Sequence, residues 1–313
     1  MRFQHRDSAI INMIYQNEGV VAKRQIKAQF WPGRNKRTME IRLAKLHNAG
    51  YISWPTLEQH QNYPIPEPIC WLGWKGAIHI ASSYGVEVQP PISFNENQLR
   101  RFQKNLREEG IRWVRQPRWS LLRHDIAVTD VKLAVLNVAE RFTRFSLAKW
   151  ISEGVFRAST DVITFQVEDR DGRRRTQPKG VCPDAYFEII DEKRLSLGEL
   201  ARARFLLEMD MATHDNNSFG REKIIPGAAY ILSNAYRARF GNNNGSWLII
   251  TSGNKTRLKN LIKQAKEKAG TNISMFFFTT LDQIQNTNLF MDPIWLKANM
   301  NHPVQLFPDP TLT

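Results

Sequence analysis

The chain has 313 residues, 42% of them hydrophobic, so it is long enough for two or three soluble domains with buried cores. Its 44 Lys and Arg residues exceed its 30 Asp and Glu residues, and the net charge of +14 favours a polyanionic partner, either nucleic acid or an acidic membrane surface. No stretch approaches the roughly 20 apolar residues of a membrane span, and the N-terminus lacks the apolar region of a signal peptide, so we expect a cytoplasmic protein without a membrane partner.

Cys70 and Cys182 lie far apart and have no C-x-x-C spacing. They support neither a zinc site nor a disulfide framework. We expect two reduced, partly buried thiols.

The N-terminal third has the pattern of a winged helix-turn-helix domain, which we place over residues 1–92. Asp7 is a candidate cap for the first helix, and glycines follow the first and third helices. The expected elements are helices at 6–17, 22–30 and 35–49, a strand at 51–52, a proline-rich wing tip at 55–68 and a returning strand at 69–72.

The third predicted helix has a basic face opposite its apolar positions Met39, Leu43 and Leu46. The residues of this face, with one just before the helix, are Arg34, Lys36, Arg37, Arg42 and Lys45. We expect them to bind double-stranded DNA, with the N-terminal end of the helix nearest the bases in the major groove. The alternative is a charged face that is only solvated.

Residues 93–123 are expected to form a basic linker helix. Leu99, Phe102 and Leu106 have helical spacing, and many arginines surround them. Residues 1–123 contain 19 basic and 9 acidic residues, a net charge of +10, and the rest of the chain contains 25 and 21, a net charge of +4. The linker arginines therefore either extend a phosphate-binding surface or serve solubility.

Residues 124–313 predict a mixed α/β sheet flanked by helices. The expected elements are a helix at 124–143, strands at 161–168, 184–190 and 202–211, a helix at 218–236 kinked near Pro226, a strand at 246–252, a helix at 255–269 and a strand at 272–279. Asp171-Gly172 is a hairpin signal. The adjoining run Arg173, Arg174 and Arg175 is either a plain hairpin tip or a loop that clamps DNA.

Carboxylates on two of these strands form the candidate site. Pro183-Asp184 opens one strand, and Glu208 and Asp210 share one face of the next apolar strand. Desolvating an unpaired carboxylate costs several kcal/mol or forces it to protonate, so these acids need a partner. Mg²⁺ or Mn²⁺ is one such partner, and Asp184, Glu208 and Asp210 are therefore candidate metal ligands.

A lysine two residues after the glutamate would complete the D…E-x-K arrangement of restriction-endonuclease-like folds, but Asp210 stands there. Asp210 is then a further metal ligand, or Lys223 on the next helix brings its ammonium group into the site. In the alternative reading, Asp184 caps a strand, Glu208 pairs with an arginine such as Arg204, and Lys223 is a surface residue.

Two residues of the helix at 124–143 are further candidates for the site. His124 is a candidate proton-transfer group, and Asp130 is a candidate additional acid. A single histidine beside an apolar helix face also serves as a structural hydrogen-bonding group.

The order of these segments resembles the replication-relaxation family. The motifs that carry the resemblance are RDSAIINMIYQNEGVVAKRQIKAQFWPGRNKRTMEIRLAKLHNAGYI, HDIAVTDVKLA, PDAYFEI, FLLEMDMAT and SWLIITS. The resemblance implies a winged-helix DNA-binding domain attached to a restriction-endonuclease-like PD-(D/E)xK domain, acting in the replication or relaxation of plasmids and other mobile elements. The residues that match the family's motifs are Asp184, Glu208, Asp210, Lys223, His124 and Asp130.

Two functions follow from this reading. The first is a metal-dependent DNA endonuclease or nickase that the winged helix directs to a site. The second is a non-catalytic DNA-binding replication initiator or regulator with a degenerate nuclease-like domain, which Asp210 at the usual lysine position favours. A second copy of the chain and replication or mobilisation proteins are further partners that either function allows.

Overall fold

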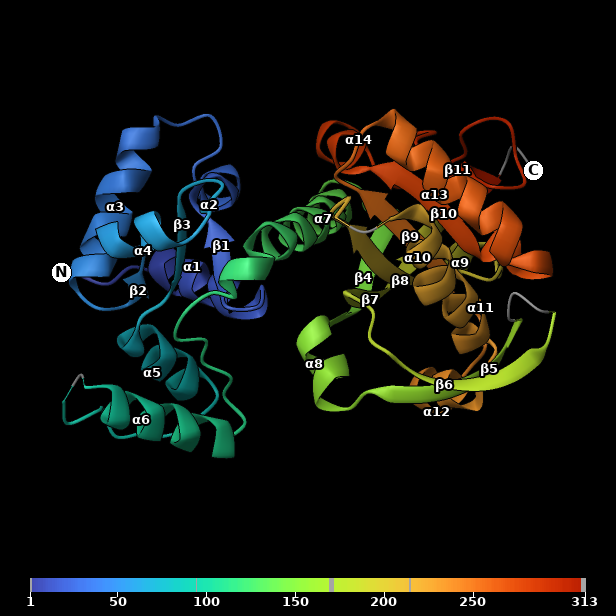
Figure 1. The fold of residues 1–313 in the computed structure, drawn as a ribbon. Coiled ribbons are helices and arrows are strands. Elements are labelled where there is room, and N and C mark those ends of the chain that lie inside the picture. The colour runs from blue at the N-terminus through green and yellow to red at the C-terminus, as the bar shows by residue number, and fades with distance from the viewer. Residues whose placement is uncertain (1, 94, 169–171, 214, 311–313) are drawn as a thin grey trace. The chain divides into compact units, whose positions relative to one another are not determined.

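The chain folds into two compact units, Met1–Thr129 and Asp130–Thr313 (Figure 1). The computed structural model describes residues 2–93, 95–168, 172–213 and 215–310. The boundary between the units falls inside helix α7 (Leu122–Arg141), several residues after the expected boundary at residue 124. No helix among the described residues is long and apolar enough to cross a membrane.

The first unit combines a three-stranded antiparallel sheet, of order β1-β3-β2, with short helices. Its elements are α1 (His5–Gln16), β1 (Val20–Ala22), α2 (Lys23–Phe30), α3 (Lys36–Asn48), β2 (Ile52–Ser53), α4 (Leu57–Asn62), β3 (Ile69–Leu72), α5 (Trp74–Ser83), α6 (Glu96–Glu108) and the 3₁₀ helix η1 (Trp119–Leu121). The three predicted helices and both predicted strands are present. The hydrophobic pair Val20-Val21 adds β1, which pairs with β3.

Helix α4 lies where a proline-rich wing tip was expected, and this is a correction. Thr56 Oγ1 accepts a hydrogen bond from the Gln59 backbone N–H at 3.2 Å, and Gln59 Oε1 accepts one from the Thr56 N–H at 3.0 Å. This reciprocal capping box stabilises a helical turn. The prolines of the segment flank the helix and do not interrupt it.

The segment predicted as a separate linker belongs to the first unit. Phe102 and Leu106 of α6 are buried, and the ring of Phe102 lies 5.3 Å from that of Trp113. Trp113 Nε1 donates a hydrogen bond to the Leu72 carbonyl at 3.0 Å, which attaches the segment to β3. The apolar spacing in α6 therefore marks a packed face.

A buried ion pair joins α1 to α3. Asp7 is the third residue of α1, not its cap, and it accepts the Gln4 backbone N–H at 2.7 Å. Arg42 Nε donates to Asp7 Oδ1 at 2.7 Å, and Arg42 Nη2 contacts Asp7 Oδ2. The Arg42 side chain is only 14% exposed and Asp7 is fully buried. Arg42 thus lies apart from the exposed basic face on which it was expected.

The second unit contains a six-stranded mixed sheet of order β11-β10-β9-β8-β7-β4. Its elements are β4 (Phe145–Ser152), α8 (Glu153–Ala158), β5 (Asp161–Glu168), β6 (Arg174–Val181), β7 (Ala185–Asp191), α9 (Glu192–Ser196), β8 (Arg202–Asp210), α10 (Asn216–Phe219), the π-helix η2 (Gly220–Ile224), α11 (Ile225–Ile231), α12 (Asn234–Phe240), β9 (Ser246–Thr251), α13 (Lys255–Lys268), the 3₁₀ helix η3 (Gly270–Met275), β10 (Phe276–Thr280), α14 (Leu281–Asn286) and β11 (Leu296–Lys297). Strands β8, β9 and β10 are parallel, and β7 is antiparallel to β8. The predicted mixed α/β sheet is confirmed.

Two strands differ from the prediction. Strand β5, expected in the main sheet, instead pairs with β6 in a separate two-stranded hairpin, from Asp161 opposite Val181 to Glu168 opposite Arg174 (Figure 1). The turn residue Asp171 lies outside the described residues. Strand β4 takes the place next to β7, but it has an irregular register between Leu147 and Lys149 that hides the alternation of a regular strand.

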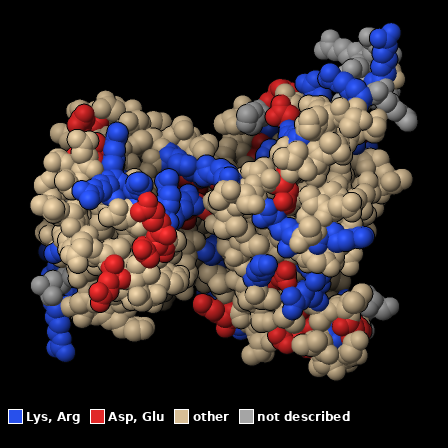
Figure 2. Space-filling model, turned by 90° about the horizontal axis from the view of Figure 1, so that it is seen from below, with Lys and Arg blue, Asp and Glu red and all other residues tan. Residues whose placement is uncertain are grey.

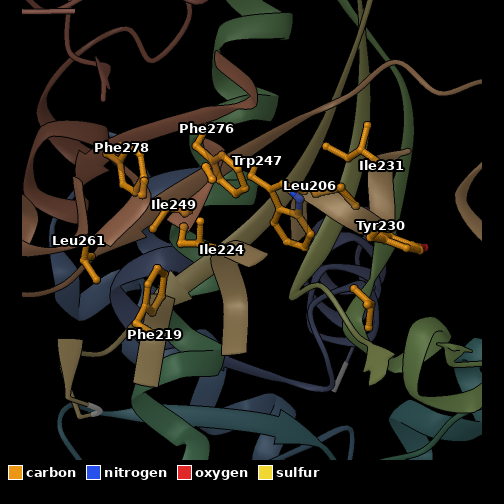
Figure 3. Close-up of a cluster of buried hydrophobic side chains, with 14 of the residues drawn as sticks. Leu206, Phe219, Ile224, Tyr230, Ile231, Trp247, Ile249, Leu261, Phe276 and Phe278 are labelled. Carbon is orange, nitrogen blue, oxygen red and sulfur yellow. The ribbon is translucent and has the colours of Figure 1, made fainter. Parts of the chain in front are cut away.

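The acids of β8 share a sheet face with the main apolar core. Leu206 on this face and neighbouring side chains of β9 and β10 pack against Phe219, Ile224 and Leu261 from α10, η2 and α13 (Figure 3). Because alternate residues of a strand point to the same face, Glu208 and Asp210 continue the row that Leu206 begins. The core therefore ends in carboxylates at the C-terminal end of β8.

The helix predicted over 218–236 is divided into α10, η2, α11 and α12. Pro226 lies near the start of α11 and has no backbone N–H to donate, so a regular α-helix cannot continue through it unchanged. The chain forms the π-helix η2 just before this point, and Lys223 lies on it. The expected interruption near Pro226 is present, and Lys223 lies on the π-helix just before it.

We expect Arg42→Ala to lower the free energy of unfolding of the first unit by about 3 kcal/mol, because it leaves the buried Asp7 carboxylate without its cation. Urea denaturation followed by tryptophan fluorescence measures this loss. Arg37→Ala, an exposed change on the same helix, should have an effect within about 0.5 kcal/mol of zero. Equal effects of the two changes would contradict a structural role for Arg42.

Candidate functional site

Asp184 is fixed at the start of β7 by two hydrogen bonds to the neighbouring strand. Its backbone N–H donates to the Leu207 carbonyl at 3.0 Å, and its Oδ2 accepts the Met209 N–H at 2.6 Å. These contacts place the carboxylate beside the β8 residue that lies between Leu207 and Met209, which is Glu208. Both acids are more than nine-tenths buried. The sequence correctly predicted that Asp184 and Glu208 are brought together by adjacent strands.

Lys223 supplies positive charge to this acid pair. Its Nζ lies 2.5 Å from Glu208 Oε1, although its side chain remains 41% exposed. Burial alone would lower the pKa of Lys223, but the charges of Glu208 and Asp184 outweigh it, so its pKa is raised above the ordinary value. Lys223 therefore stays protonated at neutral pH. The expectation that this lysine reaches the acids from the following helix agrees with its position.

Charged and thiol groups that the sequence analysis missed surround the pair. Lys179 on β6 interacts electrostatically with Glu208 and Lys223, and burial lowers its pKa. The pKa of Cys182 is raised to about 11 by burial and by the nearby charges of Glu153 and Asp184, which keeps its thiol neutral. No short motif marks Lys179, because the pairing that brings its hairpin near η2 and α11 is tertiary.

Asp210 has partners of its own. Arg257 Nε and Nη2 donate to Asp210 Oδ2 and Oδ1 at 2.9 and 2.7 Å, and Thr251 Oγ1 donates to Oδ2 at 2.7 Å. Among the described residues, no group of three or more His, Cys, Asp or Glu side chains is placed to hold a metal ion. The three predicted metal ligands are therefore not gathered at one point, and the pair next to Lys223 is Asp184 and Glu208.

The other candidate residues of the site have different neighbours. His124 belongs to the first unit, and its Nδ1 lies 3.4 Å from Asp125 Oδ1. Asp130 Oδ2 accepts a hydrogen bond from Gln285 Nε2 at 2.9 Å. Neither of these two contacts is made with Asp184, Glu208 or Lys223.

The alternative partner of Glu208 is also placed elsewhere. Arg204 Nε lies 4.0 Å from Glu188, whose other carboxylate oxygen accepts a hydrogen bond from Arg202 at 2.7 Å. Tyr186 donates to Glu188 at 2.8 Å. Arg204 therefore lies next to the neighbouring acid of β7, whereas Glu208 forms an ion pair with Lys223.

Most of the predicted DNA-binding residues are exposed. In the first unit these are Arg34, Lys36, Arg37 and Lys45. In the second unit Arg173 and Arg175 are exposed, and the side chain of Arg174 lies outside the described part of the structure. Figure 2 shows Lys and Arg side chains spread over the visible face of each unit, with Asp and Glu among them. Arg42 is the exception, because it is paired with Asp7.

Glu208→Gln should lower the pKa of Lys223, because it removes the largest charge that opposes the effect of burial. Since the folded pKa is raised, the ion pair should stabilise the fold fully below the ordinary value of 10.5 and lose this effect as the pH rises through the folded pKa. The deficit in unfolding free energy of the variant should therefore be constant near neutral pH and shrink above pH 10.5.

Nuclear magnetic resonance titration of the lysine side chains and denaturation at several pH values measure these two effects. Glu222→Gln is the matched control, because Glu222 is exposed and adjoins Lys223 in the chain. A pKa of Lys223 that is unchanged in Glu208→Gln would contradict the ion pair.

Residues 13–236 match the model of the replication-relaxation family. No curated protein and no solved structure matches the chain. The matched range includes Asp184, Glu208 and Lys223, and the family indicates a role in the replication or relaxation of plasmids or mobile elements. Because the match covers more than half of its length, this chain belongs to the replication-relaxation family.

Proposed function

We propose that this protein is a metal-dependent DNA endonuclease or nickase that acts on plasmid or mobile-element DNA. The observation that carries this proposal is the meeting of Asp184 and Glu208 on adjacent strands with the protonated Lys223. Two carboxylates at the ends of the inner strands β7 and β8 of a mixed α/β sheet, with a lysine beside them, have the chemistry of a restriction-endonuclease-like site. Here the lysine comes from a helix and not from the strand.

The donor set of this site suits Mg²⁺ or Mn²⁺. Mg²⁺ typically binds one or two carboxylates and completes its coordination with water and substrate phosphate oxygens. Asp184 and Glu208 provide two such carboxylates, and both are held in place by contacts within the second unit. The two acids already interact favourably with the ammonium of Lys223, which supports a site that favours positive charge.

Each residue has a separate role in the proposed reaction. Asp184 and Glu208 would hold the ion. When bound, it would lower the pKa of its water ligand and stabilise negative charge on the phosphate. Lys223 is protonated and partly exposed, so it can donate a hydrogen bond to a phosphate oxygen of the DNA backbone. The nearby Lys179 adds positive charge that favours a polyanionic substrate.

The first unit would bring double-stranded DNA to this site. The order of α1, β1, α2, α3, β2 and β3, with the three-stranded sheet, supports a winged helix, and α3 would be its recognition helix. The exposed Lys36 and Arg37 lie in the first turn of α3. That is the end of a recognition helix that contacts base edges and phosphates.

A second function is favoured by the position of Asp210. The residue two places after Glu208 is an acid paired with Arg257, and no third carboxylate joins the candidate ligands among the described residues. These features suit a DNA-binding replication initiator or regulator that has lost cleavage. The same cleavage experiment separates the two functions.

The endonuclease proposal predicts Mg²⁺-dependent nicking or linearisation of supercoiled plasmid. Asp184→Asn and Glu208→Gln should each lower the cleavage rate at least about 100-fold, which corresponds to roughly 3 kcal/mol in the barrier. Their affinity for DNA should stay within about twofold of the wild type, because the charge on the first unit is unchanged. Gel electrophoresis of the plasmid and a binding titration measure the two quantities.

Glu188→Gln is the matched control, because it removes a buried carboxylate from the same sheet that is paired with Arg202 and not with Lys223. Its cleavage rate should be close to that of the wild type. Tight DNA binding by the wild type without cleavage in either Mg²⁺ or Mn²⁺ would support the regulator instead.

Replacing Lys36 and Arg37 together by alanine should weaken DNA binding and reduce its salt dependence. Each lost phosphate contact should lower the slope of log K against log salt by about 0.9. Fluorescence anisotropy at several salt concentrations measures the slope. Lys75→Ala, an exposed change on α5, should leave it unchanged. An unaltered slope in the double variant would exclude α3 as the main phosphate-binding helix.

A further inference from the structure

The pair formed by Asp210 and Arg257 is built at the position where a strand-borne lysine would stand. Arg257 is the third residue of α13, and two of its nitrogens bind the two oxygens of Asp210. The exposed fractions of the side chains are 11% for Arg257 and 2% for Asp210. A bidentate, largely buried pair of this kind fixes both direction and distance. The end of β8 is thereby attached to the start of α13.

Arg257 also reaches the segment that carries Lys223. Its Nη1 donates a hydrogen bond to Asn216 Oδ1 at 2.8 Å. Asn216 is the first residue of α10, and α10 continues directly into η2, which contains Lys223. One guanidinium group therefore connects the strand of Glu208 to the helical segment of Lys223.

A second contact of α13 holds the same segment closer to Lys223. Gly220, the first residue of η2, lies so near Gln264 that a Cβ atom there would come within 2.5 Å of Gln264 Oε1. A polar cavity of about 300 Å³ is lined in part by Asn216, Lys263 and Gln264 from the same two elements. Helix α13 thus contacts the segment before Lys223 at Asn216 and packs closely against it at Gly220, and Arg257 forms the contact that also reaches β8.

We infer that Arg257 is a positioning residue for Lys223. A lysine on the strand itself would be held by the sheet, whereas Lys223 lies on a π-helix whose position relative to β8 must be set by side chains. Asp210 holds Arg257, and Arg257 in turn holds the segment of Lys223. The acid at the usual lysine position therefore helps to position the lysine that comes from the helix. The inference rests on the proposed function for its effect on catalysis, but the positioning itself is a property of the fold.

The reactivity of Lys223 towards an acylating reagent tests the positioning directly. Mass spectrometry of the full-length protein after timed treatment with the N-hydroxysuccinimide ester of acetic acid gives the rate at Lys223. In Arg257→Ala, Lys223 should lose its close contact with Glu208 and become more accessible to the reagent, so it should react at least about tenfold faster, equivalent to about 1.4 kcal/mol in the barrier. An unchanged rate would overturn the inference.

Arg144→Ala is the matched control. Arg144 forms a bidentate pair with Asp191 at the other end of β7, and the exposed fractions of these side chains, 14% and 0%, are close to those of the Asp210 pair. If loss of any buried arginine simply loosened the unit, both variants would raise the rate at Lys223 alike. We expect only Arg257→Ala to do so, and equal increases would overturn the inference.

Two milder changes decide the question even if Arg257→Ala fails to fold. Asn216→Ala keeps the Asp210 pair and removes the hydrogen bond from Arg257 to α10, and it should raise the rate at Lys223 about threefold, equivalent to about 0.6 kcal/mol in the barrier. Arg257→Lys keeps the positive charge but cannot bridge Asp210 and Asn216 at once. It should therefore resemble Arg257→Ala, and wild-type rates at Lys223 in both milder variants would refute the bridge.

The cleavage assay separates this inference from the proposed function. If the wild type cleaves plasmid, Arg257→Ala should lower kcat about tenfold or more with unchanged affinity for DNA. If the wild type does not cleave, the proposed function fails, and the acylation rates still decide whether Arg257 positions Lys223.

Discussion

Two carboxylates buried side by side must be met by positive charge, and this constraint organises the second unit. Asp184 accepts a hydrogen bond from the Met209 N–H of β8, so its charge lies beside Glu208, and both side chains are more than nine-tenths buried. Lys223 meets them both electrostatically, with its ammonium against Glu208. A buried acid pair without a cation would have to take up a proton. The position of Lys223 is therefore as important to the fold as to any chemistry at this site.

The helices that follow β8 bring that cation to the strand. The chain after β8 forms the short helix α10, the π-helix η2 and then α11, which contains Pro226, and their apolar side chains pack on the same sheet face as the acids. The apolar core determines how near this segment comes to the sheet. The bridge from Asp210 through Arg257 to Asn216 then limits how it can slide along the sheet. Apolar packing, which is not directional, thus sets the distance of the segment from the sheet, and the directional hydrogen bonds limit its movement along the sheet.

The basic surplus of the chain divides into two classes with different physical roles. Arg42, Arg144 and Arg257 are largely buried and each neutralises one carboxylate. The exposed cations of α3 have no buried partner among the described residues: Lys36 forms only a solvent-exposed ion pair with Glu40, which leaves its charge accessible to a polyanion. Net charge alone does not separate these classes, because an arginine contributes equally to it in either place. Arg42 illustrates the difference, because it lies on the same helix as Lys36 and Arg37 but is paired with the buried Asp7.

The sequence by itself determined the local elements and the face on which each acid lies. Helical spacing gave the three helices of the first unit, and strand alternation placed Glu208 and Asp210 on one face, because these periods are properties of the backbone. Irregular β4 lacked such a period, and the capping box of α4 lay hidden between prolines. Only the tertiary structure decided which cation meets which acid: Asp7 with Arg42, Glu208 with Lys223 and Asp210 with Arg257. The physical reason is that charge acts through space, and residues far apart in the chain become neighbours only once the apolar faces have packed.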